Sequence, residues 1–533
     1  MRSFEIDFAK ATTPVRKTFD NIKNSNTQIS IELIGFKNGT LGFFKKESII
    51  ITEENFHPYL NHGGFDYLGR SVDKIRSDEE KVQAAKTCCE MNLTGLILVG
   101  ATHTISDALI LSEYFIKESI NTRVIAIPCT VDGNVSHPMF EATVGFDTAS
   151  KVYSQLIGNI MTDAASNTKY WYFIRLMGRN PSHLVLECAL QTHPNYVIIS
   201  EEIAKNNSSL SAIVSEICDI IVERAKQKKN FGTVLIPEGF ISYLPHFSGL
   251  IEELNKVFQP SNKDHYKDLD FERIINAEDS DLDYLKRFLS PWSASYLLYL
   301  PDFIRRELLY ERESSGGLQL SQIETEKLIS YCVSKELSKR KSEGKYSGTF
   351  SSITHFFGYQ GRCSHPSVFD ANLATCYGYT ACLLIKKGLT AYSVTAKGLN
   401  SKPEDWLLGG IPLTSMCTLK KSTTYGQSFA HISSCDVNLE SKAFLELKGR
   451  RKNWVTADHF RNPGPIQFFD FGKNEINLTM KINFENYRKY ISEIEKYCNK
   501  IRLASNFGVR EEILQVTVLS LENLDKLLKL IKK

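Results

Sequence analysis

The sequence predicts a doubly wound α/β fold whose parallel-rich sheets are buried on both faces. Short apolar runs rich in β-branched residues recur, and each is followed by Gly or polar residues and then by a stretch of helical periodicity. The runs are ISIELIGF, TGLILVG, RVIAIP, YWYFIRLMG, NYVIIS and GTVLIPEG. Ligands of such folds bind beyond the carboxyl ends of the strands, so the residues after each run are the candidates for a binding site.

Two further segments complete the expected architecture. Between about 242 and 348 the pattern changes to long charged stretches with apolar positions three and four apart, including SQIETEKLISYCVSKELSKRKSE, which predicts a helical insertion. A second group of short apolar segments follows, from ITHFFGYQGR to LTAYSVTA. The last sixty or so residues contain INFENYRKYISEIEKYCNK and ENLDKLLKLIKK, which predict C-terminal amphipathic helices.

Composition excludes several classes of protein. The 533 residues are 42% apolar and 23% charged, with a net charge of +3 and no basic stripe, so we expect no nucleic-acid partner. The twelve cysteines form no C-x-x-C pair and predict reduced thiols, as in cytoplasmic proteins. The N-terminus has no apolar export signal, and no run approaches the roughly eighteen apolar residues of a membrane span. We therefore expect a cytoplasmic protein without a membrane partner.

The first candidate segment follows the run RVIAIP, where Thr130, Asp132, Gly133 and Asn134 form a short turn. A carboxylate at this place can accept a proton from a substrate hydroxyl. The alternative is a purely structural Asx turn, because Asp-Gly is a common turn dipeptide.

The other candidates also lie at strand ends. Met177, Gly178 and Arg179 follow YWYFIRL; the Gly permits close backbone approach and the Arg offers a planar fork for a phosphate, although a surface Arg is the alternative. Glu238 ends the run GTVLIPE and suits sugar hydroxyls, whereas Tyr359 and Arg362 flank Gly361 and suit a phosphate. For these three the alternatives are a salt-bridged Glu and a packed Tyr.

Together these segments resemble the long, plant- and parasite-type pyrophosphate–fructose-6-phosphate 1-phosphotransferases, members of the phosphofructokinase family. The resemblance covers more than four-fifths of the chain, from GFKNGTLGFF to RNPGPIQF. It rests on GGFDYLGRS, VGFDTASKVYSQLIGN, RLMGRNPSH, ECALQTHPN, IPEG, IETEKL and GYQGR.

The resemblance implies a phosphofructokinase-like fold with two doubly wound lobes. The expected domains are a donor-side lobe at 28–145 completed by 366–440, a fructose-6-phosphate lobe at 146–365 that includes the insertion at about 242–348, and a C-terminal helical extension at 441–533.

The resemblance also implies roles for individual residues. Asp132 is expected to be the base that deprotonates the attacking 1-hydroxyl, with Thr130 beside the sugar. Lys169 and Tyr170 are expected to reach the site of a partner subunit. The residues expected to hold fructose 6-phosphate are Met177, Gly178, Arg179, Glu238, Tyr359 and Arg362. Gln360 stands where catalytic members usually carry a Glu.

The donor side departs from the family pattern at three internal positions. Thr102 replaces an Asp that positions Mg²⁺, Cys129 replaces a Lys that neutralises the transferring group, and Asn134 replaces a second Asp. A neutral Thr is a poor Mg²⁺ anchor. The N-terminal strand and Gly-rich phosphate loop of catalytic members are also not recognisable in the first thirty residues, so the expected metal site is degraded and no metal ligands are assigned.

Three hypotheses follow from this pattern. The first is a regulatory, non-catalytic subunit of glycolysis that binds fructose 6-phosphate and pairs with a catalytic subunit in a homo- or hetero-oligomer. The second is an active phosphotransferase that uses pyrophosphate, with ATP as the less favoured alternative donor. Here a start codon chosen too late would account for the missing loop. The third is a scaffold that binds no sugar phosphate.

Overall fold

The computed structural model describes residues 32–483 except 61, 63, 72, 136, 138, 179–180, 259–269, 313–316, 422–427 and 466–475, and five single positions at 496, 515, 518, 519 and 523. Two compact units are distinguished, Met1–Thr479 and Met480–Lys533, and the first contains every element below. The predicted C-terminal helices and the segment of the expected Gly-rich loop fall almost wholly outside the described residues.

The described chain alternates helices and strands, as predicted. The strands are β1 (Ile34–Phe36), β2 (Ser48–Ile50), β3 (Gly95–Gly100), β4 (Arg123–Thr130), β5 (Val144–Gly145), β6 (Trp171–Leu176), β7 (Tyr196–Val197), β8 (Gly232–Pro237), β9 (Ser352–Phe357), β10 (Tyr392–Lys397), β11 (Leu407–Pro412), β12 (Cys417–Lys421) and β13 (Ser428–Ile432). The helices up to the insertion are α2 (Gly39–Lys45), α3 (Glu53–Phe56), α4 (Phe65–Leu68), α5 (Asp78–Glu90), α6 (Thr102–Lys117), α7 (Phe146–Asn167), α8 (His183–Thr192), α9 (Ser200–Asn206) and α10 (Leu210–Lys226). The later helices are α11 (Pro245–Val257), α13 (Phe271–Ile275), α14 (Leu282–Leu285), α15 (Pro291–Tyr299), α16 (Asp302–Tyr310), α17 (Thr325–Ser342), α18 (Tyr359–Arg362), α19 (Val368–Lys386) and α20 (Lys442–Trp454).

The first sheet has the order β11-β10-β4-β3, with β5 paired to the end of β4. β3, β4 and β10 run parallel, whereas β11 is antiparallel to β10. Helices α6 and α19 both pack against β4. All residues of β4 after Arg123 are buried, as expected for a strand covered on both faces.

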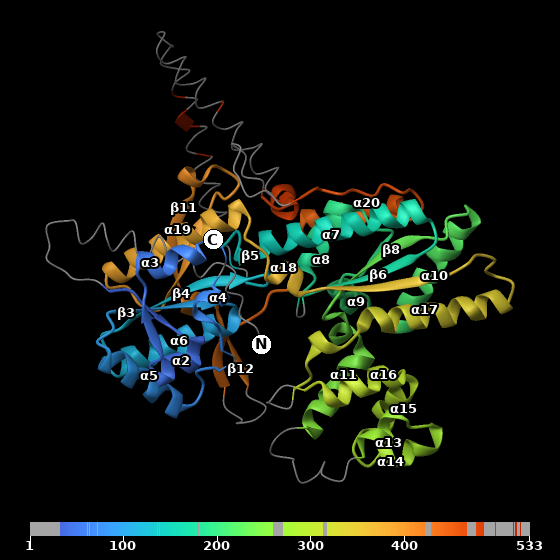
Figure 1. Cartoon of the computed structure of the whole chain (residues 1–533), viewed down its shortest axis with the longest axis horizontal. Helices are drawn as coiled ribbons and strands as arrows, with labels where there is room; N and C mark the ends of the chain where they lie inside the picture. Colours follow the sequence, from blue (N-terminus) through green and yellow to red (C-terminus); the bar gives the residue numbers. More distant parts are fainter. Residues whose placement is uncertain are drawn as a thin grey trace. The chain divides into compact units, whose positions relative to one another are not determined.

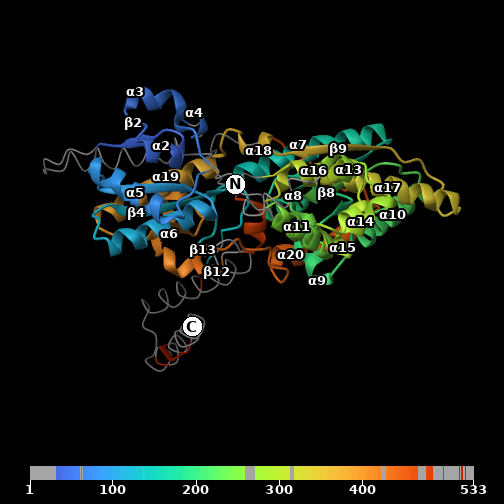
Figure 2. The same ribbon diagram turned by 90° about the horizontal axis from the view of Figure 1, so that it is seen from below.

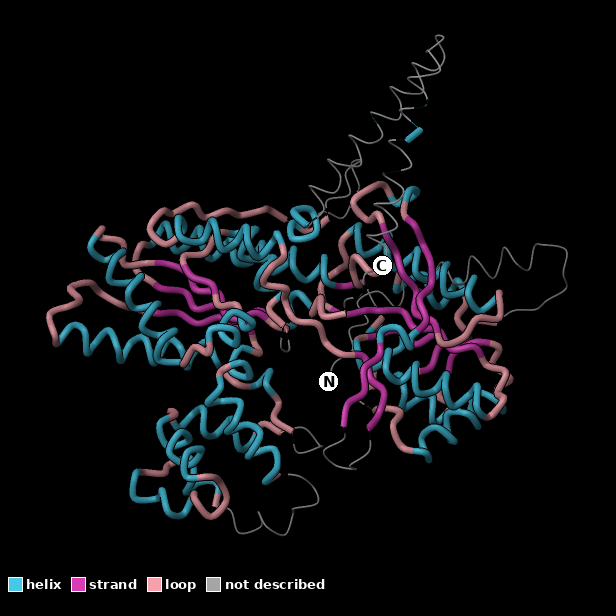
Figure 3. The backbone as a smooth tube through the Cα atoms, turned by 180° about the vertical axis from the view of Figure 1, so that it is seen from behind, coloured by secondary structure: helices cyan, strands magenta, loops and turns pink. Residues whose placement is uncertain are grey.

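The second sheet is wholly parallel and has the order β7-β8-β6-β9. Helices α7 and α8 cover one side, and α17 packs against β6 and β9 on the other (Figure 1). The two main sheets are separate groups of strands, each flanked by helices (Figure 3). These features confirm the predicted α/β fold with parallel-rich sheets.

One predicted strand has a different role from the one expected. The run ISIELIGF does not enter a parallel sheet in its described part: β1 pairs antiparallel with β2, with Ile34 opposite Ile50. The apolar run signals burial, and it does not specify which strand will be its neighbour.

The helical insertion predicted at 242–348 is present: helices α11 and α13 to α16 are grouped together, and α17 lies along the second sheet (Figures 1 and 2). It shares one hydrophobic core with the second sheet. Buried Leu297 and Leu308 of the insertion belong to the same cluster as Trp171 and Phe173 of β6. The insertion is therefore an integral part of this lobe.

Helix α19 is long and apolar enough to cross a membrane by length and composition alone. Half of it is buried, and it packs against β4, β10 and β11. Its apolar composition is accounted for by this position on the first sheet.

A buried ion pair joins β6 to the insertion. Nε of Arg175 lies 2.6 Å from Oε2 of Glu326 on α17, and both side chains are at most 5% exposed. Arg175 also donates to the carbonyl of Ser321 at 3.1 Å and lies over the ring of Phe356. Burial raises the pKa of Glu326 even though Arg175 opposes the shift. The buried carboxylate of Glu326 is therefore stabilised by the positive charge of Arg175.

We expect Arg175→Met to destabilise the protein by about 3 kcal/mol or more, because it leaves Glu326 buried without its cation. The double variant Arg175→Met/Glu326→Leu should recover most of that loss, since apolar groups of similar volume then fill the space. Denaturant unfolding of the two variants measures the effect. A double variant no more stable than Arg175→Met would contradict this account of the pair.

Candidate functional site

The turn that carries Asp132 lies at the carboxyl end of β4. The amide of Asp132 donates to Oγ1 of Thr130 at 3.1 Å, and both side chains are buried. Gly133 has a φ of +64°, and a Cβ there would lie 2.8 Å from the ring of Phe146. The turn thus packs directly against the start of α7, which only glycine permits at this position.

The residues that follow β6 and β8 lie next to each other at the carboxyl ends of these strands. The amide of Gly178 donates to Oε2 of buried Glu238 at 3.3 Å. The amide of Met177 donates to the carbonyl of Phe357 at 2.9 Å, which joins this loop to the end of β9. Arg179 lies outside the described residues, so its predicted role stays a prediction.

Tyr359 and Arg362 form the one-turn helix α18 directly after β9. The guanidinium of Arg362 lies over the ring of Tyr359, 4.8 Å from its centroid. Tyr359 is 42% exposed, whereas Arg362 is 5% exposed. Oε1 of Gln360 accepts from the amide of Gly358 at 2.9 Å, so the amide side chain at this position caps the start of the turn.

Tyr153 on α7 connects these groups, and sequence reasoning did not single it out. It is fully buried, and its hydroxyl donates to the carbonyl of Gly358 at 2.5 Å. Burial raises the pKa of Tyr153 well above its usual value; the carboxylates of Glu238 and Asp132 add to the shift, and Arg362 opposes it. Asp132, Glu238 and Arg362 therefore all lie within electrostatic range of the Tyr153 hydroxyl, as does Cys188 of α8.

Lys169 and Tyr170 do not join this group. They precede Trp171 at the amino end of β6, whereas Met177 follows the carboxyl end. At about 3.3 Å a residue, the strand separates Tyr170 from Met177 by roughly 20 Å. Lys169 is exposed and Tyr170 is half-buried.

The three expected donor-side positions are buried and neutral. Cys129 is in β4, Asn134 follows the Asp132 turn, and Thr102 is the first residue of α6. Oδ1 of Asn134 has no hydrogen-bond partner among the described residues.

Among the side chains of Thr102, Cys129, Asp132 and Asn134, that of Asp132 is the one carboxylate. Mg²⁺ sites favour carboxylates together with substrate phosphates. In the part of the chain that the structure describes, no group of three or more His, Cys, Asp or Glu side chains is placed to hold a metal ion. Of these four side chains, Asp132 supplies a carboxylate, Thr102 and Asn134 supply neutral oxygens, and Cys129 supplies a thiol.

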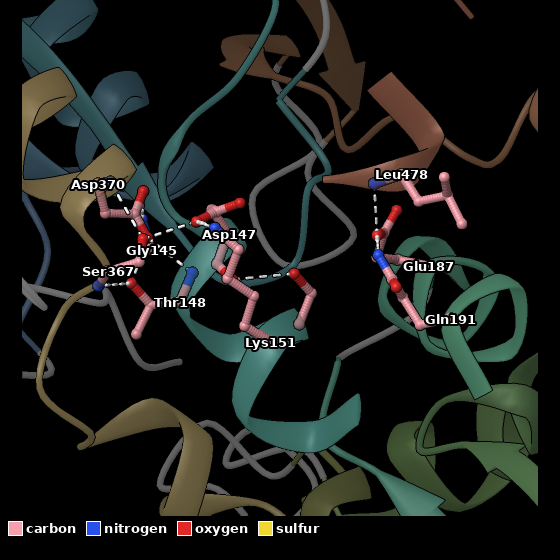
Figure 4. Close-up of polar contacts among 10 residues, drawn as sticks. Gly145, Asp147, Thr148, Lys151, Glu187, Gln191, Ser367, Asp370 and Leu478 are labelled. Atoms are coloured by element: carbon pink, nitrogen blue, oxygen red, sulfur yellow. Dashed lines mark hydrogen bonds and ion pairs between the residues drawn. The ribbon is translucent and has the colours of Figure 1, made fainter. Parts of the chain in front are cut away.

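A buried polar network fixes the start of α7 (Figure 4). Asp370 accepts from the amides of Gly145 at 3.0 Å and Thr148 at 2.8 Å, and from the hydroxyl of Thr148. Asp147 pairs with Lys151 at 2.7 Å and accepts from the hydroxyl of Ser367 at 2.6 Å. Burial, and then the charge of Asp147, raise the pKa of Asp370 to about 6. The network joins α7 to the start of α19.

A second buried carboxylate, Glu187 of α8, holds the segment after α20. It accepts from the amides of Leu478 and Thr479, each at 2.6 Å, and from the side chain of Gln191 at 2.9 Å (Figure 4). Residues 478–483 are helical, so Glu187 supplies acceptors to the free amides of a helix start.

A pocket of about 250 Å³ lies among β7, α9, α10 and α20. Glu202 and Arg451 line it and form a two-pronged ion pair with both contacts at 2.7 Å. None of the predicted site residues lines this pocket.

Comparisons with known proteins give a consistent result. A protein-family model described as phosphofructokinase matches residues 18–291. Pyrophosphate–fructose 6-phosphate 1-phosphotransferase subunit alpha 2 of Arabidopsis thaliana is 37% identical over 493 residues, which are 91% of this chain and 77% of the relative. The phosphotransferase of Treponema pallidum (strain Nichols) is 39% identical over 82% of this chain and 75% of its own length. Subunit beta 2 of Arabidopsis thaliana is 37% identical over 84% of this chain and 76% of its own length.

Solved structures agree on the fold. The pyrophosphate-dependent phosphofructokinase from Nitrosospira multiformis superposes with a TM-score of 0.51 at 12% identity, covering 90% of this chain and 97% of that one. That from Marinobacter aquaeolei gives a TM-score of 0.50, also at 12% identity, over 89% of this chain and 97% of its own. At such identity the likeness concerns the fold, and it confirms the phosphofructokinase-like architecture.

The raised pKa of Asp370 predicts a pH-dependent stability. Because the folded-state pKa of about 6 exceeds the 3.8 of an unperturbed aspartate, the folded state holds this proton more tightly than the unfolded state. The stabilisation is complete below the unfolded pKa and is lost as pH rises through the folded pKa. The stability advantage of wild type over Asp370→Asn should therefore be larger at pH 4 than at pH 7.5.

Unfolding free energies measured at both pH values test this prediction. Glu79→Gln, at an exposed position on α5, is the matched control and should show no comparable change with pH. An advantage of equal size at both pH values would mean that Asp370 does not titrate in this range.

Proposed function

Since this chain belongs to the phosphofructokinase family, we propose that it is a non-catalytic, regulatory subunit that binds fructose 6-phosphate or a closely related sugar phosphate. In this role it serves glycolysis in the cytoplasm and assembles with a catalytic subunit of the same family.

The observation that carries the proposal is a contrast between two sets of residues. Asp132, Glu238 and Arg362, predicted for the sugar phosphate, are buried acidic and basic side chains that follow β4, β8 and β9. Thr102, Cys129 and Asn134, predicted for the phosphate donor, are neutral and equally buried. A phosphoryl transfer needs charge stabilisation by metal and cations at the donor, which these three side chains do not supply.

Each acceptor residue has a role that suits its chemistry. Gly178 leaves room for the ligand to approach the backbone, and the Glu238 carboxylate can accept from sugar hydroxyls. Arg362, with Arg179, provides guanidinium forks for the 6-phosphate, and Tyr359 covers it. Asp132 accepts from the 1-hydroxyl of the sugar, so in this subunit it orients that hydroxyl.

Mg²⁺ serves members of this family, and at the donor side of this chain it would meet Asp132 as its single carboxylate. Losing one preorganised stabiliser commonly costs about a hundred- to a thousand-fold in rate, and here several are replaced together. We therefore assign this subunit no resident metal ion and no turnover of its own.

Assembly with another subunit is supported by the relatives and by two residues. The plant relatives are named as alpha and beta subunits. Lys169 and Tyr170 lie roughly 20 Å from the site of their own chain, at the opposite end of β6. We propose that they complete the sugar-phosphate site of a neighbouring subunit.

An active pyrophosphate-dependent phosphotransferase is the second candidate. It is favoured by Asp132, the predicted base, which is held in a well-formed turn beside Thr130. In that case the donor would be bound by residues other than Thr102, Cys129 and Asn134.

Assays of the purified full chain separate the two candidates. We expect no fructose 1,6-bisphosphate from fructose 6-phosphate and Mg²⁺ with either pyrophosphate or ATP. Fructose 6-phosphate alone should raise the unfolding free energy, by about 2.7 kcal/mol at a hundred times its Kd. Arg362→Met should abolish that gain.

The decisive control is Asp132→Ala. Turnover in wild type that disappears in Asp132→Ala would overturn the non-catalytic proposal in favour of the active enzyme. Absence of both turnover and sugar-phosphate stabilisation would overturn both candidates and leave the scaffold hypothesis.

A further inference from the structure

An extended segment, residues 433–437, leads from the end of β13 toward α20 and is called here the strap. It has no regular secondary structure, yet hydrogen bonds hold it on both sides. These bonds connect parts of the candidate site that are far apart in the sequence.

On the donor side the strap is joined to α6 and to the Asp132 turn. The amide of Ile432, just before the strap, donates to Oγ of Ser106 at 2.9 Å. The amide of Cys435 donates to the carbonyl of Asn134 at 2.9 Å. The strap therefore holds Asn134, which lies two residues after Asp132 in the same turn.

On the sugar side three more bonds hold the strap. Nε2 of His183 lies 3.0 Å from the carbonyl of Cys435, and since a carbonyl only accepts, the imidazole donates. The hydroxyl of Tyr243 donates to Asp436 at 2.7 Å. The amide of Val437 donates to Oε1 of Glu201 at 2.9 Å.

Glu201, on α9, joins the strap to the start of α8. The same Oε1 accepts from the amide of Ser182 at 3.0 Å, and Ser182 is the residue just before α8 begins. The hydroxyl of Ser182 in turn accepts from the amide of Ser200 at 2.8 Å. Glu201 is 6% exposed, so water does not compete effectively for these bonds.

We propose that Glu201 is a positioning residue for the sugar-phosphate site: through its two buried hydrogen bonds it sets Ser182, at the start of α8, against the strap that holds the Asp132 turn. This inference rests on the proposed function, because it concerns the site assigned there to fructose 6-phosphate. Glu201 itself does not touch the ligand. It fixes the start of α8 relative to the strap, and through the strap it fixes the turn that carries Asp132.

Glu201 positions these segments through the hydrogen bonds that its Oε1 accepts, and its negative charge matters less. A glutamine has the same length and one carbonyl oxygen that can accept from both amides. Oε2 of Glu201 has no hydrogen-bond partner among the described residues, so an amide nitrogen in its place breaks none of the described bonds. Alanine removes the acceptor and leaves two buried amides unpaired.

The test measures the Kd of fructose 6-phosphate by calorimetry on the full chain, in wild type and three variants. We expect Glu201→Ala to weaken binding about tenfold, the size of one lost charge-assisted hydrogen bond, and Glu201→Gln to stay within about threefold of wild type. Glu202→Ala is the matched control: it removes the next carboxylate on the same helix, and with it the ion pair to Arg451, so it should cost stability without changing the Kd.

A purely structural role would lower the melting temperature of Glu201→Ala and leave its Kd equal to that of wild type, which would overturn the inference but not the proposed function. Wild type that does not bind fructose 6-phosphate would overturn both. Hydrogen exchange on wild type guards against a variant that fails to fold. Fructose 6-phosphate should slow exchange at the amides of Cys435 and Val437, and unchanged exchange there would also overturn the inference.

Discussion

The carboxylate of Asp370 is the constraint on which the candidate site depends. It gathers the amides of Gly145 and Thr148 at the start of α7, and Gly145 is paired in the sheet with Thr130. Helix α18, which carries Arg362, also packs against α7. Burying this carboxylate beside Asp147 is unfavourable, and the hydrogen bonds together with Lys151 offset that cost.

The residues expected to bind a ligand are held in place by neighbouring groups that are not themselves expected to contact it. Tyr153 lies under α18, and a side chain on Gly361 would come within 2.4 Å of its ring. Glu238 is oriented by the amide of Gly178. In the proposed subunit this framework keeps the sugar-phosphate half in shape.

Strand positions were predictable because a strand covered on both faces must be a continuous apolar run, as TGLILVG and RVIAIP are. The prediction that ISIELIGF enters a parallel sheet was wrong, because tertiary packing determines which strand pairs with which. The residues at strand ends, such as Asp132 and Glu238, were also predictable from the fold class. Tyr153, Asp370 and Glu201 were not, because their bonds reach as far as 236 positions along the chain and leave no local pattern.

The order of strands in the first sheet has a consequence for synthesis on the ribosome. β4 is completed on one side by β10, and the contact between Val124 and Thr390 spans 266 positions. The second sheet, β6 to β9, lies between these two segments in the sequence. All of its strands are therefore synthesised before β10. The strands of the second sheet can pair while the chain emerges, before the apolar flank of β4 has its neighbour β10. Nascent chains that stop short of residue 392 therefore present an open sheet edge, the kind of surface that chaperones recognise.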